Sequence, residues 1–243
     1  MRRDAAPYQS AMELAPRARG AEFRLPLALA APRAGEILVD CPSGGAYLRP
    51  ELAEFAPGCR YVPFESKPQY AAFVPDLVLG DWLRLPFRAA SVDVLLSIAA
   101  LHHLLGGRGP FYREGARVLA PGGRLVVADV AADTGPARWL DDFVGRRSSE
   151  GHQADFLEAD RERRALEAAG LRVRHAELAH YTWDFADRPA ACGFMKGLFR
   201  LDQPGLCEIE EAIGDLLGWA DGPGAHVRWT LLHLRADRPE EER

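Results

Sequence analysis

Short apolar runs bounded by turn residues alternate with amphipathic segments along the chain. Two of these runs, Val92–Ser97 and Gly123–Val130, are rich in β-branched residues and lie next to glycine or proline. This pattern is typical of strands that are covered on both faces of a parallel sheet. Between them Phe111, Val118 and Leu119, spaced i, i+7 and i+8, form one apolar helix face, which a Pro-Gly-Gly sequence should end. The stretch therefore predicts a strand, a helix and a second strand, which together make a βαβ unit.

The same reasoning predicts five more strands around this unit. Three precede it, at Glu36–Asp40, Arg60–Phe64 and Asp76–Leu79, and two follow it, at Leu171–Leu178 and Val227–Arg235. We expect an α/β fold with a Rossmann-like, seven-stranded, mostly parallel sheet and helices on both of its faces. In open sheets of this kind, ligands bind beyond the carboxyl ends of the strands. The residues that follow the strands are therefore the candidates for a site.

Two segments fall outside the predicted sheet. Residues 1–35 should form an N-terminal helical arm, in which three prolines keep any helices short. The core is predicted to comprise residues 36–178 and 223–235, with an inserted helical lid at 179–222 and a charged tail at 236–243. The last two predicted strands are separated by 48 residues, far more than a hairpin needs. The insertion is rich in aromatic side chains, namely Tyr181, Trp183, Phe185, Phe194, Phe199 and Trp219.

Composition narrows the class of protein. A chain of 243 residues is long enough for one α/β domain with a sizeable core and short for two. Only two of the 30 basic residues are lysines, yet the net charge is −5 and no strong basic patch is implied, so we expect no nucleic-acid partner. The four cysteines contain no C-x-x-C pair, which predicts reduced thiols, no metal site and a cytoplasmic location. Neither a signal peptide nor a membrane-spanning run is expected.

Three blocks of the sequence carry a resemblance to a known family. GDWLRLPF, SVDVLLSIAALHHL and ARVLAPGGRLVVADV follow one another within residues 80–130. In order and spacing they resemble the central half of class I S-adenosylmethionine-dependent methyltransferases, small-molecule branch. The resemblance implies a methyl group transferred from S-adenosylmethionine to a small-molecule acceptor, with the N-terminal arm folded over the pocket. A packing arm with no role in the site is the alternative.

The first candidate cofactor residues follow the first two strands. Asp40 precedes a Gly44-Gly45 turn where the family has D-x-G-x-G-x-G, which would let the backbone approach the methionine and ribose moieties closely. Here Pro42 and Ala46 stand at two glycine positions, so a plain strand-to-helix turn is the alternative. Glu65 ends the second strand 25 residues after Asp40. That spacing is close to the ~20 residues of dinucleotide-binding folds, and predicts a ribose-binding carboxylate rather than a surface acid.

The next candidates come from the resemblance alone. The acid of the Gly-Asp pair after the third strand, Asp81, would accept a hydrogen bond from the adenine amino group. Trp82 would then stack on adenine or cover the edge of the core. Ser97 ends the fourth strand, where the floor of the methyl-transfer site begins.

Three residues are candidates for a general base, which is needed only if the acceptor carries a protonated nucleophile. They are His103, His152 and Tyr181. Because His102 and His103 are adjacent, we expect one to point inward and the other toward the sheet or solvent. The alternatives are that the histidine pair is a structural signature and that His152 is a capping or solvent-facing residue.

The aromatic insertion bears on the acceptor. Beside the carboxyl edge of the sheet it would form a lid over an apolar or aromatic acceptor, and the alternatives are a satellite core or a homodimer face. The altered glycine-rich loop motivates a second hypothesis, a methyltransferase-fold protein with lost or altered cofactor use that binds or regulates a partner. A nicotinamide-dependent enzyme is disfavoured because no G-x-G-x-x-G follows the first strand.

Overall fold

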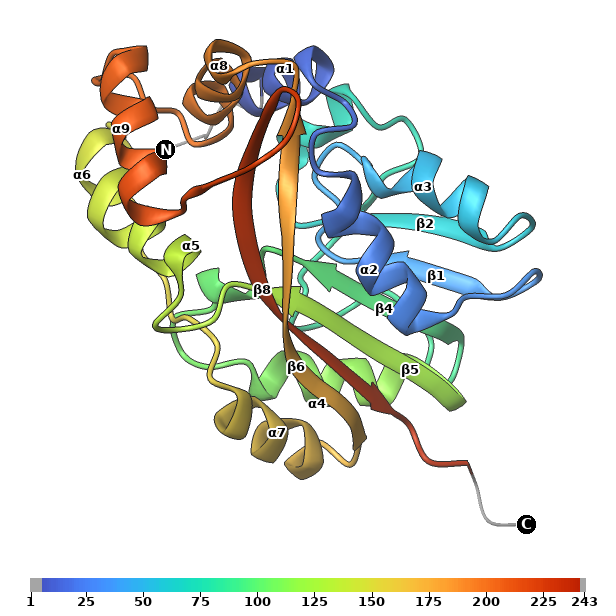
Figure 1. Ribbon diagram of the computed structural model, residues 1–243. Helices are drawn as coiled ribbons and strands as arrows, with labels where there is room; N and C mark the ends of the chain where they lie inside the picture. The colour runs from blue at the N-terminus through green and yellow to red at the C-terminus, as the bar shows by residue number, and fades with distance from the viewer. Residues whose placement is uncertain (1–5, 241–243) are drawn as a thin grey trace.

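A computed structural model describes residues 6–240 and shows a central twisted sheet with helices on both sides (Figure 1). Its strands run in the order β3-β2-β1-β4-β5-β8-β6, and β7 pairs with the outer part of β8. Neighbours from β3 to β5 are parallel, whereas β8 is antiparallel to both β5 and β6. The expected mostly parallel, Rossmann-like sheet is therefore confirmed. The strands are β1 (Ile37–Asp40), β2 (Arg60–Glu65), β3 (Val78–Leu79), β4 (Val92–Ile98), β5 (Leu119–Asp129), β6 (Arg172–Phe185), β7 (Trp219–Ala220) and β8 (Ala225–Asp237).

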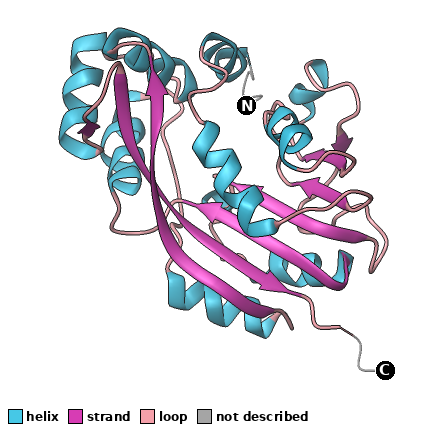
Figure 2. Ribbon diagram, turned by 45° about the vertical axis from the view of Figure 1, so that its right-hand side comes forward, coloured by secondary structure: helices cyan, strands magenta, loops and turns pink. Residues whose placement is uncertain are grey.

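Successive residues of the central strands enter two separate cores. In β1, Leu38 belongs to one core and Val39 to the other, because neighbouring side chains in a strand point to opposite faces. Helices α2 and α3 cover the first face, and α4 and α7 cover the second (Figure 2). Burial on both faces explains the continuous apolar runs of these strands. The helices are α1 (Ala6–Leu14), α2 (Gly20–Ala30), α3 (Leu48–Phe55), α4 (Gly109–Val118), α5 (Gly135–Arg138), α6 (Gly145–Arg147), α7 (Ala159–Ala168), α8 (Arg188–Leu198) and α9 (Leu206–Leu216), with short turns η1 (Pro68–Ala72) and η2 (Leu101–His103) and a π-helix, η3 (Trp139–Val144).

The last two long strands differ from the prediction. β6 continues past Leu178 to Phe185 and pairs with β8 over this whole length, so residues 179–185 belong to the sheet and not to the insertion. In the extension, exposed His180 and Asp184 alternate with more buried positions such as Trp183. Because polar and apolar residues are mixed here, the sequence did not predict that the strand continues. β8 ends at Asp237, so the first two residues of the predicted tail are also paired.

The turn predicted at Pro121-Gly122-Gly123 also differs from the structure. The Pro-Gly-Gly sequence follows the end of α4 as expected, but it lies inside β5, which already begins at Leu119. Leu119 pairs with Val92, and a register irregularity separates this pair from the regular ladder that begins at Arg124. The strand tolerates proline and glycine here because the ladder is interrupted at this point.

The N-terminal arm and the insertion pack together beyond the carboxyl ends of the parallel strands. Helix α1 lies against α8, and a β-carbon on Gly197 would come within 3.0 Å of the Ala11 side chain. Figure 1 shows α1, α8 and α9 at the same end of the molecule, where β6 and β8 project beyond the rest of the sheet. The two segments thereby roof the edge at which a ligand is expected. In the part of the chain that is described, no helix has the length and apolarity to span a bilayer.

Candidate functional site

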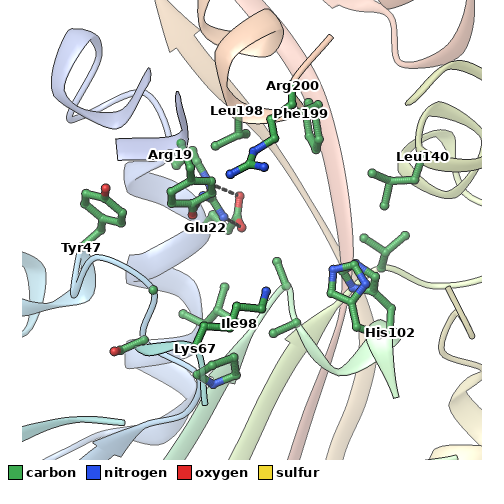
Figure 3. A pocket seen from close by; sticks show the side chains of 18 of the residues that line it. Arg19, Glu22, Tyr47, Lys67, Ile98, His102, Leu140, Leu198, Phe199 and Arg200 are labelled. Carbon is green, nitrogen blue, oxygen red and sulfur yellow. Dashed lines mark hydrogen bonds and ion pairs between the residues drawn. The ribbon is translucent and has the colours of Figure 1, made fainter. Parts of the chain in front are cut away.

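A cavity of about 260 Å³ lies between the carboxyl ends of β1, β2 and β4 and the roof formed by the arm and the insertion (Figure 3). Five predicted site residues line it: Asp40, Gly44, Glu65, His103 and His152. Residues that the sequence analysis did not select line it as well, including Arg19, Glu22, Tyr47, Lys67, His102, Trp183, Phe199, Arg200 and Trp229.

Glu65 is the buried acid at the end of β2, with only 3% of its surface exposed. One carboxylate oxygen accepts hydrogen bonds from the backbone N–H groups of Ser66 (2.8 Å) and Lys67 (3.1 Å), and the other accepts from that of Gly44 (3.1 Å). The carboxylate therefore holds the turn after β1 against the end of β2. The Ser66 hydroxyl also donates to the first oxygen (3.4 Å), whereas among the described residues the second oxygen accepts only from Gly44. Because each carboxylate oxygen offers about two acceptor sites, the second oxygen has capacity left for a ligand hydroxyl.

The turn after β1 forms despite its departure from the family pattern. Gly44 has φ +55°, a conformation that glycine adopts without strain, and Ala46 adopts φ +58°. Asp40 is 4% exposed and accepts a hydrogen bond from the Tyr61 hydroxyl (2.6 Å). Burial raises the pKa of Asp40 to about 7, against the lowering effect of the Tyr61 bond and together with the nearby charge of Glu65. Near neutral pH Asp40 therefore exchanges its proton beside the Glu65 side chain.

Four predicted cofactor residues do not line the cavity among the residues described. Asp81 is exposed and accepts a hydrogen bond from the Leu83 N–H (2.8 Å), while Trp82 packs against the core beneath α4. Gly45 lies in the turn beside Gly44, and Ser97 is buried within β4. Their assignment to the cofactor stays a prediction.

A cluster of histidines forms the floor of the cavity, next to the carboxyl ends of β4 and β5. Nδ1 of His102 lies 2.6 Å from Asp129 Oδ1, and Asp129 Oδ2 accepts hydrogen bonds from the backbone N–H groups of Ala100 and His102. Although burial opposes ionisation, the charge and hydrogen bond of His102 hold the pKa of Asp129 below its ordinary value. The buried carboxylate thus fixes both the turn η2 and the His102 ring.

The expectation that one of the two histidines points inward and the other toward solvent agrees with their burial: His102 is 4% exposed and held by Asp129, whereas His103 is more exposed. Both rings nonetheless line the cavity, with centroids 4.1 Å apart, because they sit in a single short 3₁₀ turn. Desolvation by burial, with the neighbouring His102 and His152, lowers the pKa of His103 to about 3, so its imidazole is neutral at physiological pH.

His152 joins this cluster from a different part of the chain. Its ring centroid lies 5.5 Å from that of His102 and 5.3 Å from that of His103. The loop that carries it is fixed, because the Asp155 N–H donates to the His102 carbonyl (2.8 Å) and Arg108 donates to the Asp155 carbonyl (2.7 Å). Arg108 is in turn bound by the buried carboxylate of Glu162. Of the proposed roles of His152, the structure favours the pocket-facing one.

Tyr181, the third candidate base, lies in β6 and is not among the described residues that line the cavity. Its hydroxyl is buried without a hydrogen-bond partner, and burial raises its pKa well above the ordinary value. Removing an unsatisfied buried hydroxyl relieves a desolvation cost. We therefore expect Tyr181→Phe to leave the free energy of unfolding unchanged or raise it by up to about 1 kcal/mol, measured by urea denaturation. A loss of more than that would mean that the hydroxyl has an unrecognised partner.

The roof is built on a buried ion pair. Arg19 donates through Nε (3.2 Å) and a terminal nitrogen (2.5 Å) to the two oxygens of Glu22, which is fully buried. Glu22 also accepts from Trp183 Nε1 (2.7 Å), and Arg19 donates to the Tyr8 hydroxyl (2.7 Å). This network connects α1, α2 and β6. Although burial opposes protonation, the charge of Glu22 raises the pKa of Arg19 further above its ordinary value.

Aromatic rings of the roof form a stack above the cavity. Trp183 and Trp229 lie with centroids 4.1 Å apart at 23°, and Phe199 packs against both at 6.3 and 6.1 Å. Arg200, next to Phe199, is paired with Glu150 of the His152 loop. Phe194 and Met195, by contrast, are buried core residues. They join the same core as the first face of the sheet rather than a satellite core. Of the three stacked rings only Phe199 comes from the insertion, because Trp183 lies in β6 and Trp229 in β8. A lid role of the insertion stays a prediction.

Comparison with known proteins finds similarity in the central part of the chain. Residues 40–127 match the family described as methyltransferase domain. A curated relative, 27-O-demethylrifamycin SV methyltransferase of Amycolatopsis mediterranei (strain S699), is 34% identical over 117 residues, which are 46% of this chain and 43% of the relative. The chain thus aligns with less than half the length of that relative.

Solved structures share the fold over most of the chain. A putative methyltransferase from Bacillus halodurans C-125 superposes with a TM-score of 0.60 at 20% identity, covering 90% of this chain and all of that one. The [4+2]-cyclase SpnF superposes with the same TM-score at 16% identity, over 90% of this chain and 80% of that one. At 16–20% identity these superpositions show a shared fold only.

Proposed function

We propose that this chain, whose residues 40–127 match a methyltransferase-domain family, transfers the methyl group of S-adenosylmethionine to a small-molecule acceptor. The family match and the fold confirm the resemblance to class I S-adenosylmethionine-dependent methyltransferases. One observation carries the proposal: the buried carboxylate of Glu65 and the histidine cluster border the same roofed cavity. The cavity therefore has a cofactor-binding side and a side on which an acceptor can react.

The residues of the first side suit the nucleoside. Glu65 has acceptor capacity left for ribose hydroxyls, and charge-assisted hydrogen bonds of this kind are strong. Gly44 lines the cavity without a side chain, which allows backbone to approach a ligand closely. S-adenosylmethionine supplies a methyl group that is transferred in one displacement.

The rest of the cavity would hold the acceptor. Displacement requires the attacking atom in line at roughly 3 Å from the methyl carbon, so positioning and exclusion of water supply much of the rate. The stacked rings of Trp183, Trp229 and Phe199 favour an apolar or aromatic acceptor. If the nucleophile is a hydroxyl, it must lose its proton. The histidine cluster at the floor of the cavity would accept that proton. The similarity to a rifamycin methyltransferase supports a small-molecule acceptor without identifying it.

A second function remains open because the glycine-rich turn departs from the family pattern. Pro42 replaces one glycine and has no backbone N–H to offer. The SpnF protein, moreover, has this fold and is a [4+2]-cyclase. The alternative is a methyltransferase-fold protein with altered cofactor use that binds or regulates a partner. A homodimer and a cytoplasmic location stay predictions from the sequence.

Calorimetric titration decides between these functions. We expect the purified chain to bind S-adenosylmethionine and S-adenosylhomocysteine with micromolar dissociation constants. Incubation with radiolabelled S-adenosylmethionine and a panel of polyketide, phenol and amine acceptors should then transfer label to at least one of them. Absence of nucleoside binding would reject the methyltransferase proposal in favour of the alternative.

A further inference from the structure

We propose that His102, His103 and His152 form a binding site for a divalent transition-metal ion, of which Zn²⁺ is the natural first candidate. Each of the three rings has a nitrogen within 4.8 Å of a nitrogen of the other two. Three imidazoles with an open position are the ligand set of many zinc centres, and imidazole also suits copper, iron and nickel. The metal site stands on this geometry, and only its catalytic role rests on the proposed function.

The distances are compatible with closure around an ion. With bonds of about 2.1 Å at tetrahedral angles, ligand nitrogens lie roughly 3.4 Å apart. The rings of the cluster would need to approach one another by little more than an ångström. Such a movement is available to His103 and His152 through rotation of the side chains.

The surroundings of His102 are those of a metal-ligating histidine. Ligating imidazoles usually donate their second ring nitrogen to a carboxylate, which fixes the tautomer and orients the ring. Asp129 lies 2.6 Å from Nδ1 of His102 and is buried, so Nε2 is the nitrogen left for an ion. Asp129 also adds a negative charge next to the site, which offsets part of the charge of a divalent ion.

The cluster is preorganised although its members are 50 residues apart in the chain. The Asp155 N–H binds the carbonyl of His102 itself, so the loop that carries His152 is tied to the turn that carries the other two ligands. Phe156 lies against the rings of His102 and His152, with centroid distances of 6.2 and 6.3 Å. This support places the open coordination position toward the cavity that all three histidines line.

The charge of Lys67 bears on the affinity of the site. Lys67 lines the same cavity as the three histidines, and its positive charge acts against a bound cation. Removing that charge in Lys67→Met should therefore tighten metal binding.

The ion would act on the acceptor of the proposed reaction. Coordination of an acceptor hydroxyl lowers its pKa, so that the O–H bond breaks and the proton passes to water in the cavity. The oxygen then forms a bond to the methyl carbon as the carbon–sulfur bond breaks. The products are the methyl ether, S-adenosylhomocysteine and one proton. With the acceptor oxygen bound to the ion, the reaction would need no separate general base.

The test is metal binding by the intact, chelator-stripped chain, which needs neither cofactor nor acceptor. We expect one equivalent of Zn²⁺ in competition with a chromogenic chelator, and a visible d–d absorption when Co²⁺ is added instead. His152→Ala and His103→Ala should each weaken Zn²⁺ binding at least 100-fold and remove the Co²⁺ band, and Asp129→Asn should weaken it about 10–100-fold. His180→Ala, which removes an exposed histidine of β6, is the matched control and should change nothing.

Thermal unfolding and S-adenosylmethionine titration of each variant separate this proposal from the proposed function. A His152→Ala chain that folds and binds the nucleoside but not Zn²⁺ supports the metal site. Wild-type Zn²⁺ binding that is no tighter than that of His152→Ala overturns it, whether or not the nucleoside binds.

Discussion

Glu65→Gln should weaken S-adenosylmethionine binding at least 100-fold, which corresponds to about 2.7 kcal/mol. Both oxygens of Glu65 accept backbone N–H groups, from Gly44 on one side and from Ser66 and Lys67 on the other. The amide of glutamine must therefore place its NH₂ group against an N–H donor, whichever way it is turned. The substitution removes the charge that ribose hydroxyls would meet and loosens the turn after β1. Calorimetry of the variant with S-adenosylhomocysteine measures the effect.

The matched control is Glu54→Gln, which makes the same chemical change at an exposed position of α3. It should bind the nucleoside as the wild type does. Far-ultraviolet circular dichroism would show whether the Glu65 variant retains its fold. Near-wild-type affinity in a folded Glu65→Gln chain would show that this carboxylate does not bind the ribose.

Glu22→Leu should lower the free energy of unfolding by about 3–5 kcal/mol, because it leaves the buried guanidinium of Arg19 without its charge partner. Glu22 has no exposed surface, and Arg19 is only 5% exposed. The same carboxylate is the acceptor for Trp183 Nε1, so the substitution also removes the hydrogen bond between the arm and β6. Urea denaturation followed by tryptophan fluorescence measures the change.

The double variant Arg19→Met/Glu22→Leu tests the cause. Replacement of both members of a buried ion pair by apolar side chains is often close to neutral, whereas removal of one partner is costly. We expect the double variant to regain most of the stability that the single variant loses. A double variant as unstable as Glu22→Leu would instead indicate that the loss comes from packing.

Among the predicted cofactor residues, Asp40 and Glu65 were placed at the cavity by local chain geometry. Asp40 and Glu65 each end a parallel strand, so the strand pattern alone places them at one edge of the sheet, and both line the cavity. Asp81 also follows a strand, but β3 contains only two residues, and the turn after it directs the carboxylate to the Leu83 N–H. A carboxylate that accepts this local hydrogen bond is less available to a ligand. No periodic pattern in the sequence reveals such a bond.

The roof and the histidine cluster needed the tertiary structure. No local pattern singles out Arg19 and Glu22, whereas packing against Trp183, 161 residues from Glu22, makes them a buried network. His152 was a candidate from resemblance, but only the bond between Asp155 and the His102 carbonyl brings it to the other two histidines.

By itself, the sequence determined the sheet, its parallel core and the edge at which ligands are expected, because continuous apolar runs, turn residues and strand ends are properties of neighbouring positions. The tertiary structure decided which side chains face one another across the cavity. Contacts such as Arg19 with Glu22 and Trp183, or His152 with His102, depend on how distant segments dock. That docking is settled by the packing of the whole core, for which no local pattern in the chain is sufficient.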